Sequence, residues 1–340
     1  MDWPVWASYV AARGGWRMLK QLLGLIFNVL VFPGGLFALC IGLMLLGIDR
    51  KVAARLQRRV GPPLYQPLID LVKLYAKELV LPRTAHTTAF QAAPILGLAG
   101  MIATAGLIPI PGVYAGLGQV NHLLILLYLL TIPAVALMLA GSASSSPFAA
   151  IGLSREMTMM MAYEIPLCMV FLTIGLKVGY LQGAGVNFSL SEIANFQLSH
   201  GSFIADFSLL PAAMALLCYI PGTMGVVPFD IPEAETEIVE GPLLEYSGVG
   251  LAFFKAMNAL KLYVVLAVAV ALFFPAVLPL GQLGNLLWFV FKICLLMLLA
   301  ITLVRTSAGR LRIDQAFKFY LFVPTGFAAL SLILTLAYRA

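Results

Sequence analysis

Long apolar stretches alternate with short polar segments along the whole chain. A membrane-spanning helix needs about 20 mostly apolar residues, and eight stretches are long enough. None of them alternates apolar and polar residues in blocks of about ten, as membrane β-barrel strands do. The pattern therefore predicts an all-α integral membrane protein in which residues 1–340 form a single polytopic membrane domain. The predicted spans are residues 22–47, 88–109, 121–141, 157–177, 208–227, 248–275, 284–304 and 317–338.

Composition agrees with a membrane protein. The chain is 61% hydrophobic and 11% charged, whereas soluble domains carry about 25% charged residues. Its four cysteines and three histidines are scattered, with no Cys-x-x-Cys pair, so they do not form the clustered ligand sets of zinc or iron–sulfur sites. No glycine-rich phosphate loop follows a strand. We therefore expect no metal, redox cofactor or nucleotide in this chain.

Basic residues are concentrated in two of the loops. The first loop, residues 49–87, carries eight Lys or Arg against three acidic residues, and the seventh, residues 305–316, carries three against one. The loops at 110–120 and 276–283 carry no charge. Since basic loops stay in the cytoplasm, we expect the odd-numbered loops there and both termini outside. The net charge of +6 then suits anionic lipid, and no nucleic-acid partner is expected.

The first twenty residues differ from a signal peptide. Their basic residues come late, and no small-residue cleavage pattern follows a short apolar core. Residues 3–16 instead hold three Trp and one Tyr, which predicts a stretch at the level of the lipid headgroups. Arg13, Arg17 and Lys20 favour the opposite orientation. We give more weight to the two basic loops, because they agree with each other and this N-terminal segment is short.

The densest charge lies in the fifth loop, residues 228–247, which we call the acidic loop. Six of the fifteen carboxylates fall between 230 and 245, and no Lys or Arg occurs between Lys177 and Lys255. Charge beside a hydrocarbon phase is costly, so it is interpreted first as functional. The six are Asp230, Glu233, Glu235, Glu237, Glu240 and Glu245.

The acidic loop is predicted to begin a helix at Asp230, which can accept from a backbone amide of the first turn. On that helix Glu233, Glu237 and Glu240 follow one another at i, i+4 and i+7 and would share one face. Like charges and burial both raise carboxyl pKa values, so such a row can hold and pass protons near neutral pH. The alternative is a solvated acidic loop with a well-capped helix.

The first loop contains a second helical pattern. Apolar residues recur at helical spacing from Leu64 to Leu79, while Asp70, Lys73 and Lys77 fall on other faces. This pattern predicts an amphipathic helix in the plane of the membrane surface. Two roles are open for it, covering the bundle while binding lipid headgroups, or docking a partner protein.

Charged and polar residues also lie inside the predicted spans. Such side chains normally face the bundle interior or a watery cavity and mark an ion path. Lys177, near the outer end of the fourth span, can instead reach the interface. The residues are Arg155, Glu156 and Glu164 in or at the mouth of the fourth span, Lys255, Asn258 and Lys261 in the sixth, and Lys292 in the seventh.

Three ordered blocks carry a family resemblance. The first is Asp49-Arg50-Lys51 with Gln57, Arg59, Gly61-Pro62, Asp70, Lys73-Leu74 and Lys77-Glu78; the second is Arg155 followed by Tyr163-Glu164; the third is Pro228-Phe229-Asp230, Pro232-Glu233, Glu235, Glu237, Gly241 and Glu245-Tyr246-Ser247-Gly248. With the eight spans, they resemble the large membrane subunit shared by respiratory complex I, where bacteria call it the H subunit, and the membrane-bound group 4 NiFe hydrogenases. The resemblance covers essentially the whole chain.

The resemblance implies a subunit of a prokaryotic inner-membrane complex that joins a hydrophilic redox arm to antiporter-like and small membrane subunits. The NiFe and iron–sulfur clusters would lie in partner subunits, including a hydrogenase-like large subunit. The expected proton path is Glu164, Glu233, Glu235, Glu237, Glu240, Glu245 and Asp230, with Lys261 and Lys292. Arg155, Glu156, Lys255 and Asn258 would support it. Arg50, Lys51, Arg59, Asp70, Lys73, Lys77 and Glu78 would dock the arm.

Two departures bear on the type of complex. Complex I members have a longer insertion in the first loop, whereas twelve residues separate Gln57 from Asp70 here. The sixth-span Glu-Tyr pair of complex I falls on Asn258 and Ala259. Both differences lie where a quinone headgroup would sit, so they favour a hydrogenase or ferredoxin-linked complex over a quinone reductase.

Two other functions compete with this hypothesis. A stand-alone secondary transporter would also need charge inside the membrane, but transporters usually contain internal repeats, and neither loop has a second copy in the chain. A passive anchor for a soluble enzyme would need the surface of the first loop. It would have no use for Glu164, Lys261 or Lys292.

Overall fold

The computed structural model describes residues 23–117, 121–183, 185–279 and 281–337. Within these ranges the chain is mainly helical, and its β-type pairings are two isolated bridges. The predicted all-α membrane fold is therefore confirmed. The headgroup-level stretch predicted at 3–16 lies outside the described residues.

Among the described residues, seven helices are long and apolar enough to cross a membrane. The remaining predicted span, the fifth along the chain, corresponds to α8, a helix of 14 residues, or about 21 Å at 1.5 Å per residue, which is shorter than the hydrocarbon core of a bilayer. Five of the seven are single helices: α4 (Thr87–Leu107), α5 (Leu123–Ala143), α6 (Pro147–Leu181), α10 (Gly248–Phe273) and α13 (Ile313–Ala337). The span Leu23–Leu56 includes α2 (Gly35–Leu56), and the span Gly281–Ser307 consists of α11 (Gly281–Met297), the π-helical η4 (Leu298–Thr302) and α12 (Leu303–Ser307). The shorter α8 is Leu210–Thr223.

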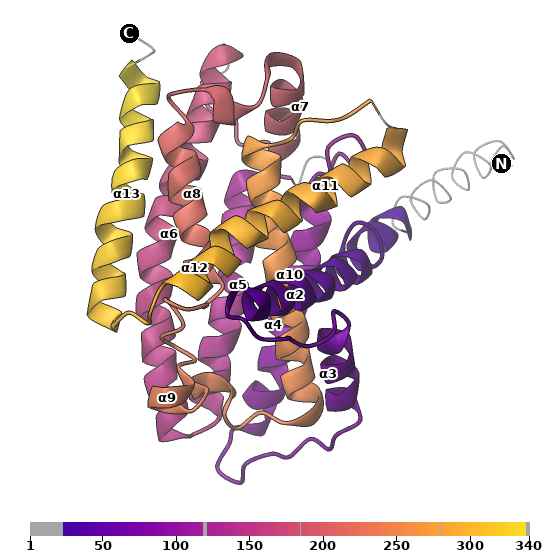
Figure 1. Ribbon diagram of the computed structural model, residues 1–340, viewed down its shortest axis with the longest axis vertical. Helices are drawn as coiled ribbons and strands as arrows, with labels where there is room; N and C mark the ends of the chain where they lie inside the picture. The colour runs from indigo at the N-terminus through magenta and orange to yellow at the C-terminus, as the bar shows by residue number, and fades with distance from the viewer. Residues whose placement is uncertain (1–22, 118–120, 184, 280, 338–340) are drawn as a thin grey trace, which may run out of the picture.

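Helix α10 is the centre of the bundle (Figure 1). Almost every side chain from Ala256 to Phe273 is buried. Many of these residues are Ala or Val, and small side chains let neighbouring helices approach closely. At Gly42 of α2, an added Cβ would collide with the Ala259 carbonyl of α10. Helices α2 and α11 cross the bundle obliquely, while α4, α6, α8 and α13 run nearly parallel to α10 (Figure 1).

The helix predicted in the first loop is present as α3 (Gln66–Tyr75) and lies beside the first half of α10 (Figure 1). It buries Pro67 and Leu71 and leaves other apolar residues exposed. The helical pattern continues to Leu79, but the helix ends at Tyr75. The segment after it ties the loop to the start of α10, because the Val80 N–H donates to Ser247 Oγ at 3.0 Å.

Shorter elements connect the spans. They are α7 (Leu190–His200), η2 (Phe203–Ala205), α9 (Glu235–Ile238) and η3 (Gly241–Leu243). The last two belong to the acidic loop, whose end is held by Tyr246. Its ring stacks on Phe90 of α4 with centroids 3.9 Å apart, and its hydroxyl donates to the Phe90 carbonyl at 2.9 Å.

Candidate functional site

The acidic loop does not form the helix predicted from Asp230. Only α9, four residues long, is α-helical, and Val239 and Glu240 have φ values of 50° and 64°. Pro232 and Pro242 disfavour a helical backbone conformation in the residue before each of them. The chain also reverses in order to bury Ile231, Ala234, Ile238 and Leu243. The predicted row of Glu233, Glu237 and Glu240 on one helical face is therefore wrong.

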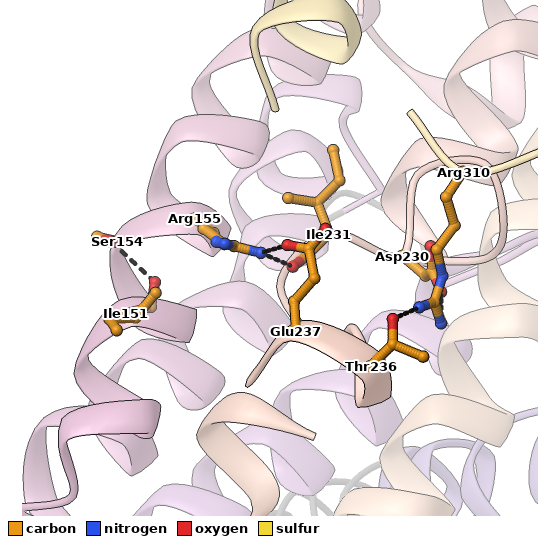
Figure 2. Close-up of polar contacts among 8 residues, drawn as sticks. All are labelled: Ile151, Ser154, Arg155, Asp230, Ile231, Thr236, Glu237 and Arg310. Carbon is orange, nitrogen blue, oxygen red and sulfur yellow. Dashed lines mark hydrogen bonds and ion pairs between the residues drawn. The ribbon is translucent and has the colours of Figure 1, made fainter. Parts of the chain in front are cut away.

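Glu237 instead forms an ion pair with α6. The Arg155 Nη1 donates to Glu237 Oε2 at 2.5 Å and to the Ile231 carbonyl at 3.4 Å. Figure 2 shows the guanidinium pointing from α6 at both acceptors. One arginine thus holds two points of the acidic loop, and its expected supporting role in the proton path stays a prediction.

Asp230 is held from the other side by Arg310, in the segment between α12 and α13. The Nε and Nη2 of Arg310 lie 2.7 and 2.6 Å from Asp230 Oδ2, and its Nη1 donates to Thr236 Oγ1 at 2.5 Å (Figure 2). The two arginines line a cavity of about 270 Å³ together with Asp230 and Glu237. Sequence reasoning missed Arg310, although it lies in the basic seventh loop.

Glu233, which is partly exposed, meets the buried Glu156 of α6 and Lys261 of α10 at one charged cluster. All three line a small cavity of about 20 Å³, together with Asn258. Glu156 and Lys261 are 7% and 5% exposed. Burial raises the pKa of the Glu233 carboxyl, although the charges of Lys255 and Lys261 oppose that rise. We call Glu156, Glu233 and Lys261 the buried cluster.

The cavity is large enough for about one water molecule. Charges in such a place are retained only when an opposite charge compensates them, and here one ammonium faces two carboxylates. The arrangement can therefore accept one proton without leaving an uncompensated positive charge. Glu156 was expected only to support the path, but the structure places it beside Glu233.

A tyrosine group continues along α6 from the buried cluster. The Tyr163 ring contacts those of Tyr219 and Tyr320, with centroids 5.7 and 6.3 Å apart, and Thr223 interacts with the Tyr163 and Tyr219 hydroxyls. Glu164 follows directly. Its Oε1 is buried, and no described residue donates a hydrogen bond to it. Tyr163 appeared in the sequence only as half of a Tyr-Glu pair, with no sign that its ring contacts other tyrosines.

The other expected path residues lie elsewhere. The Lys292 Nζ donates to the carbonyls of Phe274 and Ala276 at 2.6 and 2.9 Å, at the end of α10. This is the far end from Lys261, because twelve residues of α10 span about 18 Å. Glu235 is exposed, and Glu240 and Glu245 are partly exposed.

The expected docking residues form a polar surface on α2, α3 and the segments beside them. Arg50 pairs with Asp70 at 3.1 Å, and Gln66 donates to the same carboxylate at 2.8 Å. The Gln66 hydrogen bond is the main reason the pKa of Asp70 is lowered, and Arg50 adds to it. The remaining docking residues are the partly buried Lys51 and the exposed Arg59, Lys73, Lys77 and Glu78.

Asp49 is a buried acid beside this surface that was not expected in the site. It is 3% exposed and accepts from Thr302 Oγ1 and Arg305 Nη1, both at 2.8 Å. The π-helical η4 ends at Thr302, so the irregular turn joins the end of α2 to the oblique α11–α12 span. The only signal of Asp49 in the sequence was its place in the Asp49-Arg50-Lys51 block that carries the family resemblance.

No group of three or more metal-binding side chains is found within the described residues. The four cysteines are free thiols. The expectation that redox centres lie in partner subunits stays a prediction.

Comparison with known proteins places the chain in a family. Residues 28–336 match the family model described as NADH dehydrogenase. The chain is 34% identical to hydrogenase-4 component C of Escherichia coli, over 76% of each chain. It is also 34% identical to the H subunit of the NADH-quinone oxidoreductase of Rubrobacter xylanophilus, over 88% of this chain and 89% of the relative.

A third relative and a solved structure agree. Formate hydrogenlyase subunit 4 of Escherichia coli is 34% identical over 80% of this chain and 87% of its own length. A chain of the membrane-bound sulfane sulfur reductase, an archaeal respiratory membrane complex, superposes with a TM-score of 0.81 at 29% identity, covering 92% of this chain and 99% of that one. With its multi-pass helical fold, the protein belongs to the NADH dehydrogenase family of membrane oxidoreductase-complex subunits, related to both complex I and hydrogenase subunits.

Proposed function

We propose that this chain joins a peripheral redox arm to antiporter-like membrane subunits and carries protons between them. The buried cluster is the observation that carries the proposal, because it brings Glu233, Glu156 and Lys261 from three separate segments into one cavity. A passive anchor has no use for such a cluster. A secondary transporter is disfavoured by the family, since the relatives named above are subunits of oxidoreductases.

The proposed route starts at the acidic loop. Glu233 receives a proton when the charge of the redox arm changes, and Glu156 shares the same cavity. From there the hydroxyls of Tyr163 on α6 and Tyr219 on α8 lead toward Glu164. Glu164 would hand the proton to a neighbouring membrane subunit. Hydroxyls can donate and accept at once, so they suit the interval between carboxylates.

Control of the route is assigned to the two arginines. Arg155 and Arg310 hold the acidic loop at Glu237 and Asp230, on either side of Glu233. A negative charge arriving above the loop would compete for these guanidinium groups. Loosening either pair would shift Glu233 relative to Lys261 and change the proton affinity of the buried cluster.

A hydrogenase or ferredoxin-linked complex in a prokaryotic inner membrane is the favoured setting. Its NiFe and iron–sulfur clusters would be held by a hydrogenase-like large subunit and iron–sulfur subunits of the arm. The residue supporting this choice is Asn258, which stands where complex I has an acid and contributes only a neutral amide to the cavity of the buried cluster. We also propose that the first loop and the acidic loop lie on the cytoplasmic side of this membrane.

The second candidate is the H subunit of an NADH:quinone oxidoreductase, forming the quinone site. The 34% identity to the Rubrobacter protein over 88% of this chain favours it. Mass spectrometry of the intact complex, purified through this chain in mild detergent, distinguishes the two. We expect a hydrogenase-type large subunit and ferredoxin-like chains. Flavin- and NADH-binding partners would move the protein to the second candidate, and a chain that purifies alone would overturn both.

The proton route is tested with Glu164→Gln and Glu237→Gln in the intact complex. Each variant should uncouple electron transfer from ion pumping or slow both, because it removes a proton-binding or loop-holding carboxylate. Proton uptake and electron transfer are measured together in membrane vesicles. Unchanged pumping in both variants would rule out the route.

A further inference from the structure

A third cavity, of about 400 Å³, opens between α2, α3 and α10. It is separate from the small cavity of the buried cluster and larger than the one between Arg155 and Arg310. One wall consists of leucines from α2 and α3, namely Leu43, Leu46, Leu71 and Leu74. The other wall is strongly basic.

Four cations and one carboxylate line this cavity, which gives a net charge of +3. The cations are Arg50, Lys73, Lys77 and Lys255, and the carboxylate is Asp70. Asp70 is already bound by Arg50 and Gln66. Within the described ranges, no carboxylate lies within ion-pair distance of the three lysines. The cavity therefore has three ammonium groups available for an anionic ligand.

The surroundings of the cavity are those of a lipid-facing surface. Leu68 and Val72 of α3 are 52% and 60% exposed. An apolar cavity of about 290 Å³ lies on the other flank of Leu43, lined by Met44, Leu64 and Leu68 among others. A ligand that suits both walls carries a negative group at one end and hydrocarbon at the other.

We propose that this cavity binds an anionic phospholipid. The phosphate lies among Lys73, Lys77 and Lys255, and an acyl chain follows Leu43 and Leu46 along α2. An acidic protein segment would satisfy the lysines but would leave the leucine wall without an apolar partner. A quinone would satisfy the leucines but carries no charge for the lysines.

The site adjoins the buried cluster through one residue. Asn258 lines both cavities, so the lipid phosphate would lie one side chain away from Glu233 and Lys261. The proposal nevertheless stands independently of the proposed function, since lipid binding is measured without any turnover.

The test uses the intact complex in nanodiscs of phosphatidylcholine that contain a trace of phosphatidylglycerol with a photoreactive acyl chain. After illumination, labelled peptides are identified by mass spectrometry. We expect labelling of α2 and α3 near Leu43 and Leu71. Lys73→Ala and Lys255→Ala should each reduce it about fivefold, the usual effect of one basic residue on anionic lipid binding.

Lys318→Ala is the matched control, because this exposed lysine of α13 does not line the cavity and its loss should change nothing. Leu46→Trp fills the cavity without altering its charge and should also reduce labelling, which keeps the test valid if a lysine variant fails to assemble. Equal labelling by a zwitterionic probe, displacement by inorganic phosphate alone, or preferential labelling of these peptides by a photoreactive quinone would overturn the proposal.

Discussion

The acidic loop and the first loop each hold an aspartate bound by an arginine, but the two pairs differ in burial. The Asp230 side chain is 13% exposed beside Arg310, whereas Asp70 is 45% exposed beside Arg50. The carboxyl pKa values of the loops also shift in opposite directions, since burial raises that of Glu233 while hydrogen bonds lower that of Asp70. Loop position therefore says little about the chemistry of a carboxylate, whereas burial and partners decide it.

The largest effect is expected from Lys261→Met, which removes the only cation of the buried cluster. No carboxylate lies within ion-pair distance of Lys261 among the described residues. Its loss should therefore cost less than the roughly 3–5 kcal/mol of a broken direct pair, about 2–3 kcal/mol, because the carboxylates of the cluster are then uncompensated. The free energy of unfolding of the purified complex, measured with denaturant, should fall by that amount. Adding Glu156→Gln should restore most of it, while Lys318→Met should change it by less than about 0.5 kcal/mol. Equal effects of the two lysine variants would contradict the account.

A smaller loss is expected when the better-buried arginine pair is broken. In a double-mutant cycle of Arg310→Ala and Asp230→Asn, the coupling energy should be about 1.5 kcal/mol, the lower end for hydrogen bonds to charged groups, because the guanidinium is 34% exposed. The cycle is read from thermal or denaturant unfolding. A coupling near zero would show that this pair does not hold the acidic loop.

The equivalent cycle of Arg50→Ala and Asp70→Asn belongs to the first loop. Both partners are nearly half exposed, so the coupling should lie below about 1 kcal/mol and should weaken further in high salt. A value above that of the Arg310 pair would reverse the comparison between the loops.

The pH dependence of stability should differ in sign between the loops. Glu233 has a pKa raised above 4.5 in the folded protein, so its folded state binds the proton more tightly. The resulting stabilisation is complete below pH 4.5 and is lost as the pH rises through the raised pKa. Unfolding measured across this range should show that loss, and Glu233→Gln should remove it. A variant that keeps the same pH dependence would assign the effect to another group.

Asp70 is expected to act in the opposite direction and more weakly. Its pKa is lowered below 3.8, so its stabilisation is complete above pH 3.8 and is lost as the pH falls through the lowered value. Asp70→Asn should flatten the acid side of the stability profile slightly. An effect on the alkaline side of the profile would contradict this assignment.

The spans could be predicted from sequence because their signal is local. Twenty apolar residues define a spanning helix wherever it packs, and all eight predicted runs are helices, with α8 the short one. The acidic-loop helix could not be predicted, because periodicity ignores the two prolines and the need to bury Ile231 and Ile238. Tertiary packing overrode the spacing of the glutamates.

The site was only partly accessible from sequence. Glu233, Lys261 and Arg155 were singled out by their type and place, but the cluster itself depends on a fold that joins three segments. Arg310 and Asp49 were missed for the same reason, since their partners Asp230 and Arg305 lie 80 and 256 residues away. Lys292 was singled out because an apolar helix contains it, and sequence could not show that it binds the carbonyls of Phe274 and Ala276, in the segment just after α10.

The most direct test of the central claim compares Glu233→Gln with Glu235→Gln in the assembled complex. Glu235, which the resemblance also places in the path, lies in the same loop but is exposed and lines neither cavity of the site. The pair of variants therefore separates a route through the buried cluster from one that uses the charge of the whole acidic loop. The quantity measured is the number of protons pumped per electron transferred in sealed membrane vesicles. We expect Glu233→Gln to lower this ratio severalfold and Glu235→Gln to leave it unchanged. An unchanged ratio for Glu233→Gln, or an equal loss in both variants, would contradict a proton path through the buried cluster.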